Sequence, residues 1–164
     1  ELNEYFADMT AEIKGQGGMV NKFIGDGIMA LFGAPISHPD DALRAVRCAL
    51  GMVRRNQEFN RRREQQGLAP LIIGVGLHTG QAVVGNIGAP EKMEYTAIGD
   101  TVNVASRVEG ENKTFGSRLL VSEATYQYVR DRVVAEPLGP AKLKGVDEPM
   151  ALYKILELKD RLEV

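Results

Sequence analysis

The segment DTVNVASRVEG, residues 100–110, contains the residues whose types and spacing are best suited to bind a phosphate group. Asn103 and Arg107 are four residues apart, so in a helix they share one face while Val102, Ala105 and Val108 occupy another. An amide and a guanidinium on one face could bind a phosphate together, because the planar fork of arginine matches phosphate oxygens. An exposed polar stripe without function has the same spacing, so both interpretations stay open at this point.

A carboxylate and two lysines are further candidates. Asp26 lies between two apolar runs in the segment MVNKFIGDGIMALFG. The pair Asp26–Gly27 favours a tight hairpin turn with positive φ at both positions, which would explain this aspartate without any function. A hairpin tip also holds a carboxylate in the open, as a magnesium site requires. Lys22, in the strand before the turn, and Lys144, in AKLKG, would ordinarily be solvated surface residues.

Hydrophobic periodicity and turn residues predict the elements that must position these side chains. We expect an α+β fold with a mainly antiparallel sheet, as a single domain over residues 1–164. Asp100 is expected to cap the start of the helix that bears Asn103, and Gly110 to end it. The expected helices cover 1–14, 40–67, 100–110 and 123–129, and the expected strands cover 19–24, 28–32, 71–80, 81–88, 94–99, 119–122, 133–139, 141–145 and 149–158.

The stretch 71–88 is expected to form a second hairpin, with its turn around Gly80. Gly74 and Gly76 point to the same side of the first strand of this hairpin, which permits another segment to approach the backbone closely. His78, at the end of this strand, is expected to be structural, and no role is assigned to His38.

Composition and charge exclude several classes of function. A hydrophobic content of 44% in 164 residues suffices for one core. The 20 basic and 22 acidic side chains leave a formal charge of −2, so nucleic acid is not expected as a partner. No apolar run approaches the ~18 residues that span a bilayer, which argues against membrane insertion of this domain. Cys48 is the single cysteine and is expected to be buried, and a cytoplasmic location follows as the default.

Three segments carry a resemblance to a known family. NKFIGDGIMALFG, EYTAIGDTVNVASRVE and LKGVDEPMALYKI closely resemble the catalytic domain of class III adenylate and guanylate cyclases, particularly of bacterial adenylate cyclases. The resemblance covers essentially the whole chain and implies a ferredoxin-like βαββαβ core. It also implies a homodimer that converts ATP to 3′,5′-cyclic AMP and pyrophosphate. The ribose 3′-oxygen would attack the α-phosphate, assisted by two Mg²⁺ or Mn²⁺ ions in each site.

The resemblance gives each candidate residue a role. Lys22 and Thr96 would recognise adenine: the lysine would donate to ring N1, and the threonine hydroxyl would accept from the exocyclic amine. Asn103 would orient the ribose, and Arg107 would stabilise charge on the reacting α-phosphate. Lys144 would hold the terminal phosphates. These residues would come from one subunit, and the metal-binding aspartates of the same site from the other.

The start of the chain departs from the family pattern. Family members carry a strand with the first metal aspartate, in a motif resembling FSDIRGFT, ahead of the helix that opens this sequence. Asp26 would be the second metal aspartate, so the chain as written would supply half of the metal site and have little activity alone. We expect the missing strand, and a sensor or regulatory domain, in a longer parent protein. The chain already begins in an amphipathic helix, with apolar residues at Leu2, Phe6, Met9 and Ile13.

Two alternative functions remain open on the sequence. Guanylate cyclases carry a glutamate and usually a cysteine where this chain has Lys22 and Thr96, so this pair favours ATP over GTP. The other alternative is a noncatalytic dimerisation or regulatory module that keeps the fold. Retention of Asp26, Asn103 and Arg107 argues against this loss of chemistry, and so does retention of Lys144.

Overall fold

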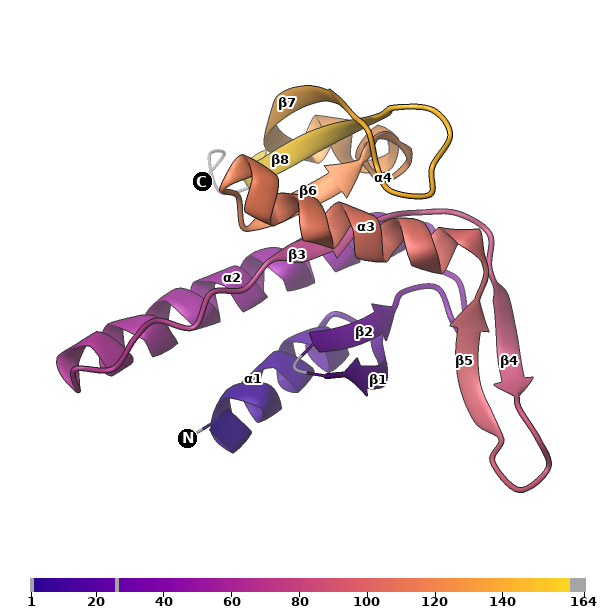
Figure 1. Cartoon of the computed structure of the whole chain (residues 1–164), viewed down its shortest axis with the longest axis horizontal. Coiled ribbons are helices and arrows are strands. Elements are labelled where there is room, and N and C mark those ends of the chain that lie inside the picture. The colour runs from indigo at the N-terminus through magenta and orange to yellow at the C-terminus, as the bar shows by residue number, and fades with distance from the viewer. Residues whose placement is uncertain (1, 26, 160–164) are drawn as a thin grey trace.

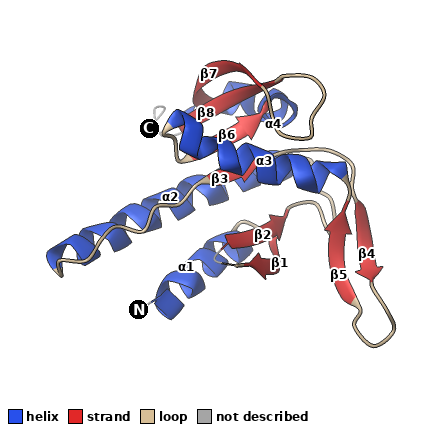
Figure 2. Cartoon of the chain, viewed as in Figure 1, coloured by secondary structure: helices blue, strands red, loops and turns tan. Residues whose placement is uncertain are grey.

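The computed structural model describes residues 2–25 and 27–159. These residues contain four α-helices and eight strands, joined by loops (Figures 1 and 2). The elements are α1 (Leu2–Gly15), β1 (Met19–Ile24), β2 (Gly27–Leu31), α2 (Asp41–Gln65), β3 (Val75–Leu77), β4 (Val83–Ile87), β5 (Glu94–Ile98), α3 (Asp100–Phe115), β6 (Leu119–Ser122), α4 (Glu123–Val129), a 3₁₀ turn (Arg130–Arg132), β7 (Val133–Ala141) and β8 (Met150–Leu158). The predicted α+β class is confirmed.

A four-stranded sheet in the order β3-β6-β8-β7 organises the main core. β6 is buried at all four positions because it has helices on both faces. Leu119 and Val121 pack with α2 and α4 on one face, whereas Leu120 packs against α3 on the other. This alternation follows from the two-residue period of a strand. The sheet therefore holds α3 at a fixed rotation on its surface.

The two remaining sheets are two-stranded and antiparallel. β1 pairs with β2 next to α1, and β4 pairs with β5 in an arm that extends away from the rest of the chain (Figure 1). Both strands of the first hairpin lie within one residue of their predicted bounds. The turn is shifted, however, because Ile24 pairs with Gly27 and the positive φ of 61° falls on Gly25. The predicted turn with Gly27 at a positive φ is therefore wrong.

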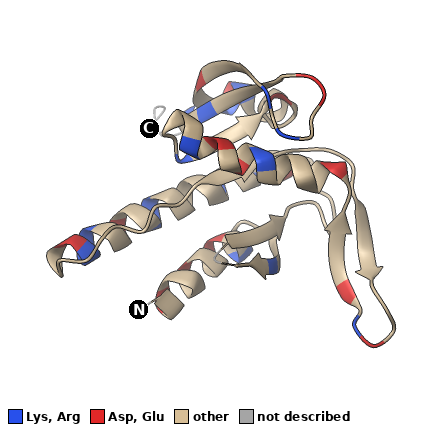
Figure 3. Ribbon diagram, viewed as in Figure 1, with Lys and Arg blue, Asp and Glu red and all other residues tan. Residues whose placement is uncertain are grey.

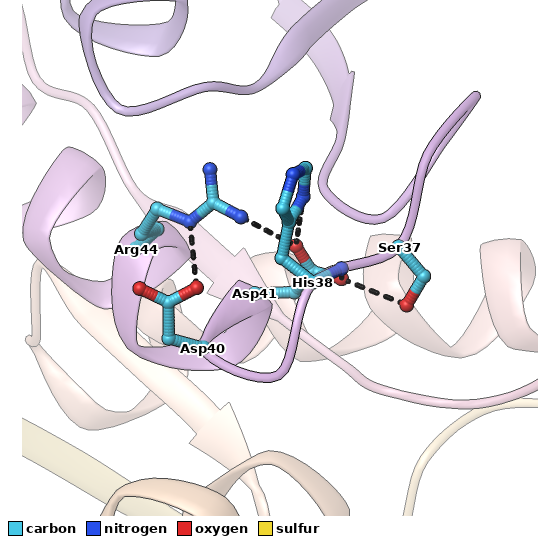
Figure 4. A network of polar contacts seen from close by, with 5 residues as sticks. All are labelled: Ser37, His38, Asp40, Asp41 and Arg44. Carbon is cyan, nitrogen blue, oxygen red and sulfur yellow. Dashed lines mark hydrogen bonds and ion pairs between the residues drawn. The ribbon is translucent and has the colours of Figure 1, made fainter.

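Helix α2 begins in a network of polar contacts (Figure 4). The carboxylate of Asp41 accepts hydrogen bonds from the backbone N–H of His38 at 2.9 Å and from the Ser37 hydroxyl at 3.1 Å. Arg44 reaches back to Asp40 and Asp41, with both nitrogen–oxygen distances at 3.1 Å. Acidic residues in a first turn also complement the helix dipole, so the predicted start of this helix is explained by its own side chains.

Helix α1 packs on α2 through Tyr5, Met9 and Phe59. Arg55 of α2 reinforces this contact, donating to Glu12 at 2.8 Å. Cys48 is only 3% exposed on the same helix, and burial together with the Glu12 charge raises the pKa of its thiol to about 12. The predicted burial of this cysteine is confirmed. Residues of both charge signs are interspersed over the elements (Figure 3), and no described helix is apolar enough over a sufficient length to cross a membrane.

The predicted hairpin over residues 71–88 is wrong. β3 pairs in parallel with β6, and β4 pairs antiparallel with β5, so these two strands do not pair with each other. The segment that follows β3 is instead held against α3, because Thr101 donates a hydrogen bond to the carbonyl of Gln81 at 2.5 Å. A Cβ on Gly80 would lie 2.7 Å from the Thr101 hydroxyl oxygen, which shows how closely the two segments approach.

The predicted limits of α3 are also wrong. Gly99, with φ 128°, occupies the N-cap position, and Asp100 is the first helical residue without a side-chain capping bond. The helix continues past Gly110 and ends at Phe115. Gly116 then adopts the left-handed conformation, with φ 62°, and its N–H bonds to the carbonyl of Asn112. Gly110 is not among the glycines with positive φ, so it lacks the left-handed conformation that ends a helix.

Candidate functional site

The outer face of α3 presents Asn103 and Arg107, and both side chains are exposed. Val104 and Val108, on the adjoining face, are 4% and 0% exposed and pack against the main sheet. This packing fixes the rotation of α3 about its axis, so the amide and the guanidinium point away from the core together. The predicted sharing of one helix face is therefore confirmed.

Lys144 lies in the loop between β7 and β8. A strand was predicted for residues 141–145, but only Ala141 belongs to one, so this prediction is wrong. The loop is fixed from both sides. Leu143 is 2% exposed and packs in the α3 side of the core, and the Lys142 ammonium donates to the carbonyls of Val146 and Asp147 at 2.8 Å each. Lys144 remains exposed beside this anchor.

These two elements bring Asn103, Arg107 and Lys144 to one open pocket of about 210 Å³. Asp100 and Val146 also line it. A guanidinium from α3 and an ammonium from the β7–β8 loop can both bind phosphate oxygens, the first through two parallel hydrogen bonds and the second as a point charge. The amide beside them can donate to or accept from a sugar hydroxyl. The pocket thus has the chemistry to hold a phosphorylated sugar.

Lys22 and Thr96 lie on β1 and β5, which belong to two different two-stranded sheets. The Lys22 ammonium lies 3.9 Å from the Glu94 carboxylate. The Thr96 hydroxyl donates to the side-chain oxygen of Asn21 at 2.8 Å, and the Asn21 amide nitrogen donates to the carbonyl of Tyr95 at 2.8 Å. These contacts bring together segments more than 70 residues apart. Neither Lys22 nor Thr96 is among the residues that line the pocket on α3.

Asp26, the predicted metal ligand, lies outside the described residues. Within residues 2–25 and 27–159, no group of three histidine, cysteine, aspartate or glutamate side chains is arranged to hold a metal ion. The described part of the chain therefore does not form a metal cage by itself. A carboxylate between β1 and β2 has the right oxygen chemistry for Mg²⁺, but further ligands would have to come from elsewhere.

Sequence reasoning missed two residues near these groups. Asp100 was interpreted only as a helix cap, yet it lines the pocket with Arg107 and Lys144. Partial burial of His78 lowers the pKa of its imidazole, and the charge of Asp100 opposes this pKa shift. The expected structural role of His78 fits its contact with Ser122, 2.7 Å from the ring Nδ1. Asn21 was missed because a single polar residue in a strand carries no periodic signal.

Residues 1–157 match the family model described as the adenylate and guanylate cyclase catalytic domain. Adenylate cyclase 1 of Rhizobium meliloti (strain 1021) is 41% identical over 155 residues, covering 94% of this chain and 23% of that relative. The chain thus spans less than a quarter of the length of that relative.

Two crystal structures show the same fold at high similarity. The adenylyl cyclase CyaB from P. aeruginosa has a TM-score of 0.87 at 33% identity, covering 95% of this chain and 80% of that chain. The guanylyl cyclase Cya2 has a TM-score of 0.86 at 38% identity, covering 96% of this chain and 79% of that chain. The fold alone therefore does not distinguish the two nucleotide classes. With its family match over nearly all residues, the chain belongs to the adenylate and guanylate cyclase catalytic domain family.

Proposed function

We propose that the chain is the catalytic domain of an adenylate cyclase, which converts ATP to 3′,5′-cyclic AMP and pyrophosphate. The observation that carries this proposal is the pocket that Asn103, Arg107 and Lys144 line together. Relatives named adenylate cyclase, at 41% and 37% identity, support it. Because a guanylyl cyclase structure is equally similar, the choice of ATP over GTP rests on Lys22 and Thr96.

In this proposal each pocket residue acts on a different part of ATP. When the ribose 3′-oxygen attacks the α-phosphorus, negative charge grows on the oxygens of that phosphate. Arg107 stabilises this charge through its guanidinium. Lys144 holds the terminal phosphates that leave as pyrophosphate. Asn103 orients the ribose so that the 3′-oxygen faces the phosphorus.

Two Mg²⁺ or Mn²⁺ ions would supply charge neutralisation of the phosphates and a lowered pKa of the attacking hydroxyl. Asp26 is the residue of this chain that we propose as a ligand. The described residues supply no metal cage, so the roles given to Asn103, Arg107 and Lys144 concern only their direct contacts with the nucleotide.

We also propose that the domain works as a homodimer, within a parent protein that carries a sensor or regulatory domain. The arm of β4 and β5 supports the dimer, because apolar side chains on it are exposed to solvent. Exposed apolar surface of this kind is typical of association sites. Exposed fractions on the arm reach 65% for Val83, 54% for Met93 and 47% for Ile98. The cytoplasmic location stays a prediction.

The test is a cyclase assay of the parent protein with ATP or GTP and a divalent ion. We expect cyclic AMP from ATP and little product from GTP. Arg107→Ala should lower kcat by about 10²- to 10³-fold, the cost of losing one charge-stabilising donor at a reacting centre. Arg118→Ala is the matched control, because it removes the same charge from another exposed residue.

Two results would contradict the proposal. A preference for GTP would favour the guanylate cyclase alternative. A folded protein that forms no cyclic nucleotide from either substrate would favour the noncatalytic module.

A further inference from the structure

Asn21 of β1 connects two successive residues of β5. Its side-chain nitrogen donates to the backbone carbonyl of Tyr95, and its side-chain oxygen accepts from the Thr96 hydroxyl, both at 2.8 Å. Thr96 is only 4% exposed, so water has little access to replace this partner. Neighbouring Lys22 extends from the same strand toward Glu94. The amide therefore bonds to Thr96 directly and precedes Lys22 in the chain, and these are the two residues that we propose to read the base.

The direction of both hydrogen bonds is determined by the groups involved. A backbone carbonyl oxygen can only accept, so the NH₂ of the Asn21 amide must face Tyr95. The amide oxygen then faces Thr96 and, being an acceptor, requires the hydroxyl to donate. A hydroxyl has one hydrogen to donate and two lone pairs to accept with. With its hydrogen committed to Asn21, Thr96 can meet a ligand only as an acceptor.

We propose that Asn21 is a specificity-determining positioning residue, which sets the base preference of the site by fixing the Thr96 hydroxyl as an acceptor. This inference rests on the proposed function. The Lys22 ammonium is a donor only, so between them the two residues offer one donor and one acceptor. Adenine presents the complementary pair, ring N1 as acceptor and the exocyclic amine as donor. Guanine presents an N–H and a carbonyl oxygen there, so like groups would face each other on both sides.

A purely structural role for Asn21 predicts a different result. If its two bonds only fastened β1 to β5, their loss would lower stability, or would lower activity with ATP and GTP alike. If Asn21 acts through the Thr96 hydroxyl, its loss frees that hydroxyl to rotate and to donate to the guanine carbonyl. The ratio of kcat/KM for ATP to kcat/KM for GTP therefore separates the two roles.

The experiment measures this ratio in the parent protein and in Asn21→Leu, which has a similar size and removes both hydrogen bonds. We expect the ratio to fall about tenfold, the size of one neutral hydrogen bond, mainly through improved use of GTP. Phe23→Ala is the matched control for a loosened β1. Phe23 is on the same strand as Asn21, and the substitution removes the contact of its ring with the Phe6 ring of α1, whose centroid lies 6.3 Å away. This control should lower the melting temperature and leave the ratio unchanged.

A double-mutant cycle with Thr96→Val tests whether Asn21 acts through the hydroxyl. In the Thr96→Val background, Asn21→Leu should change the ratio no further. Competitive binding of ATP and GTP gives the same ratio if turnover is lost in a variant. An unchanged ratio in Asn21→Leu, or an equal change in both backgrounds, would overturn the inference while leaving the adenylate cyclase proposal intact. A parent protein that prefers GTP would contradict both.

Discussion

Protonation of the half-buried His78 imidazole changes the stability of the fold. Burial lowers its pKa, and the charge of Asp100 opposes that shift without cancelling it. Its ring Nδ1 lies 2.7 Å from the hydroxyl of Ser122, which is fully buried. Because the folded pKa lies below the unfolded value, the folded protein binds fewer protons. His78 therefore contributes stability above the unfolded pKa, and this contribution is lost as the pH falls through the folded pKa.

We accordingly expect His78→Gln to flatten part of the pH dependence of the free energy of unfolding between about pH 7 and pH 5, where histidine titrates. Urea denaturation at several pH values measures this, and the difference between variant and parent protein isolates one residue from the carboxylates. His38→Gln, in the exposed loop before α2, serves as the control with the same substitution. Parallel curves for His78→Gln and the parent protein would contradict the expectation.

Single residues differ in how far the sequence could predict their place. The four-residue spacing of Asn103 and Arg107 predicts a shared face because helix geometry is local. Lys144 reaches the same pocket only because Leu143 anchors its loop in the core, and no local pattern contains that contact. Asn21 and Thr96 are 75 residues apart, so their hydrogen bond depends on how β1 meets β5.

At the scale of elements, α3 rests almost directly on the backbone of β3. A Cβ on Gly76 would lie 2.5 Å from the Cα of Glu109, closer than real side chains permit. At 3.6 residues per turn, Glu109 lies on the face of α3 roughly opposite to Asn103 and Arg107. Any outward shift at Gly76 therefore moves the pocket side of the helix. The close approach predicted for Gly74 and Gly76 is confirmed.

Gly76→Ala should consequently lower kcat, by up to about 10²-fold, because an error of about 1 Å in a reacting geometry has this effect. Steady-state kinetics with ATP measure the loss, and thermal unfolding shows whether the fold persists. Gly110→Ala is the matched control on the same helix, because a Cβ there would meet nothing within 4 Å. Gly110→Ala should keep kcat, and its free energy of unfolding should rise by roughly 0.5–1 kcal/mol because alanine is the better helix former. A normal kcat in Gly76→Ala would show that catalysis does not require the close approach of α3 to β3.

The element errors share one physical origin. The run of apolar residues around Gly80 has the local pattern of a hairpin, but β3 pairs with β6, whose residues lie 44 positions further along. Likewise, AKLKG alternates like a strand, and Ala141 and Leu143 are both buried, but the strand ends at Ala141 and Leu143 anchors a loop. Local patterns correctly predicted α1 and α2, whose backbone hydrogen bonds join residues near in sequence. They also predicted the β1–β2 pair, whose strands follow one another in the chain. They could not predict pairings decided by the whole sheet.

At the scale of the whole molecule, the proposed homodimer predicts that two inactive variants can complement each other. Asp26→Ala removes a proposed metal ligand and Arg107→Ala removes charge stabilisation, so each homodimer should be nearly inactive. If subunits exchange freely, half of the dimers are mixed, and each mixed dimer has one site with neither defect. Activity should recover to roughly one quarter of the parent level.

The two variants, made in the parent protein with different tags, are unfolded, mixed and refolded together, and the formation of cyclic AMP is measured. The tags identify mixed dimers, and each variant refolded alone is the control. Mixed dimers without any recovery would mean that Asp26 and Arg107 do not serve one site from two subunits.

Cys48 gives the chain a built-in reporter of its own internal motions. A thiol reacts with alkylating reagents as the thiolate, and a pKa of about 12 leaves almost none of that form at neutral pH while α2 stays packed. Labelling must then wait for transient openings that expose the helix to water, so its rate counts those openings. As the single cysteine, Cys48 reports them without interference. Slower labelling with bound nucleotide would show that binding in the pocket on α3 also reduces the transient openings of α2, on the opposite face of the sheet.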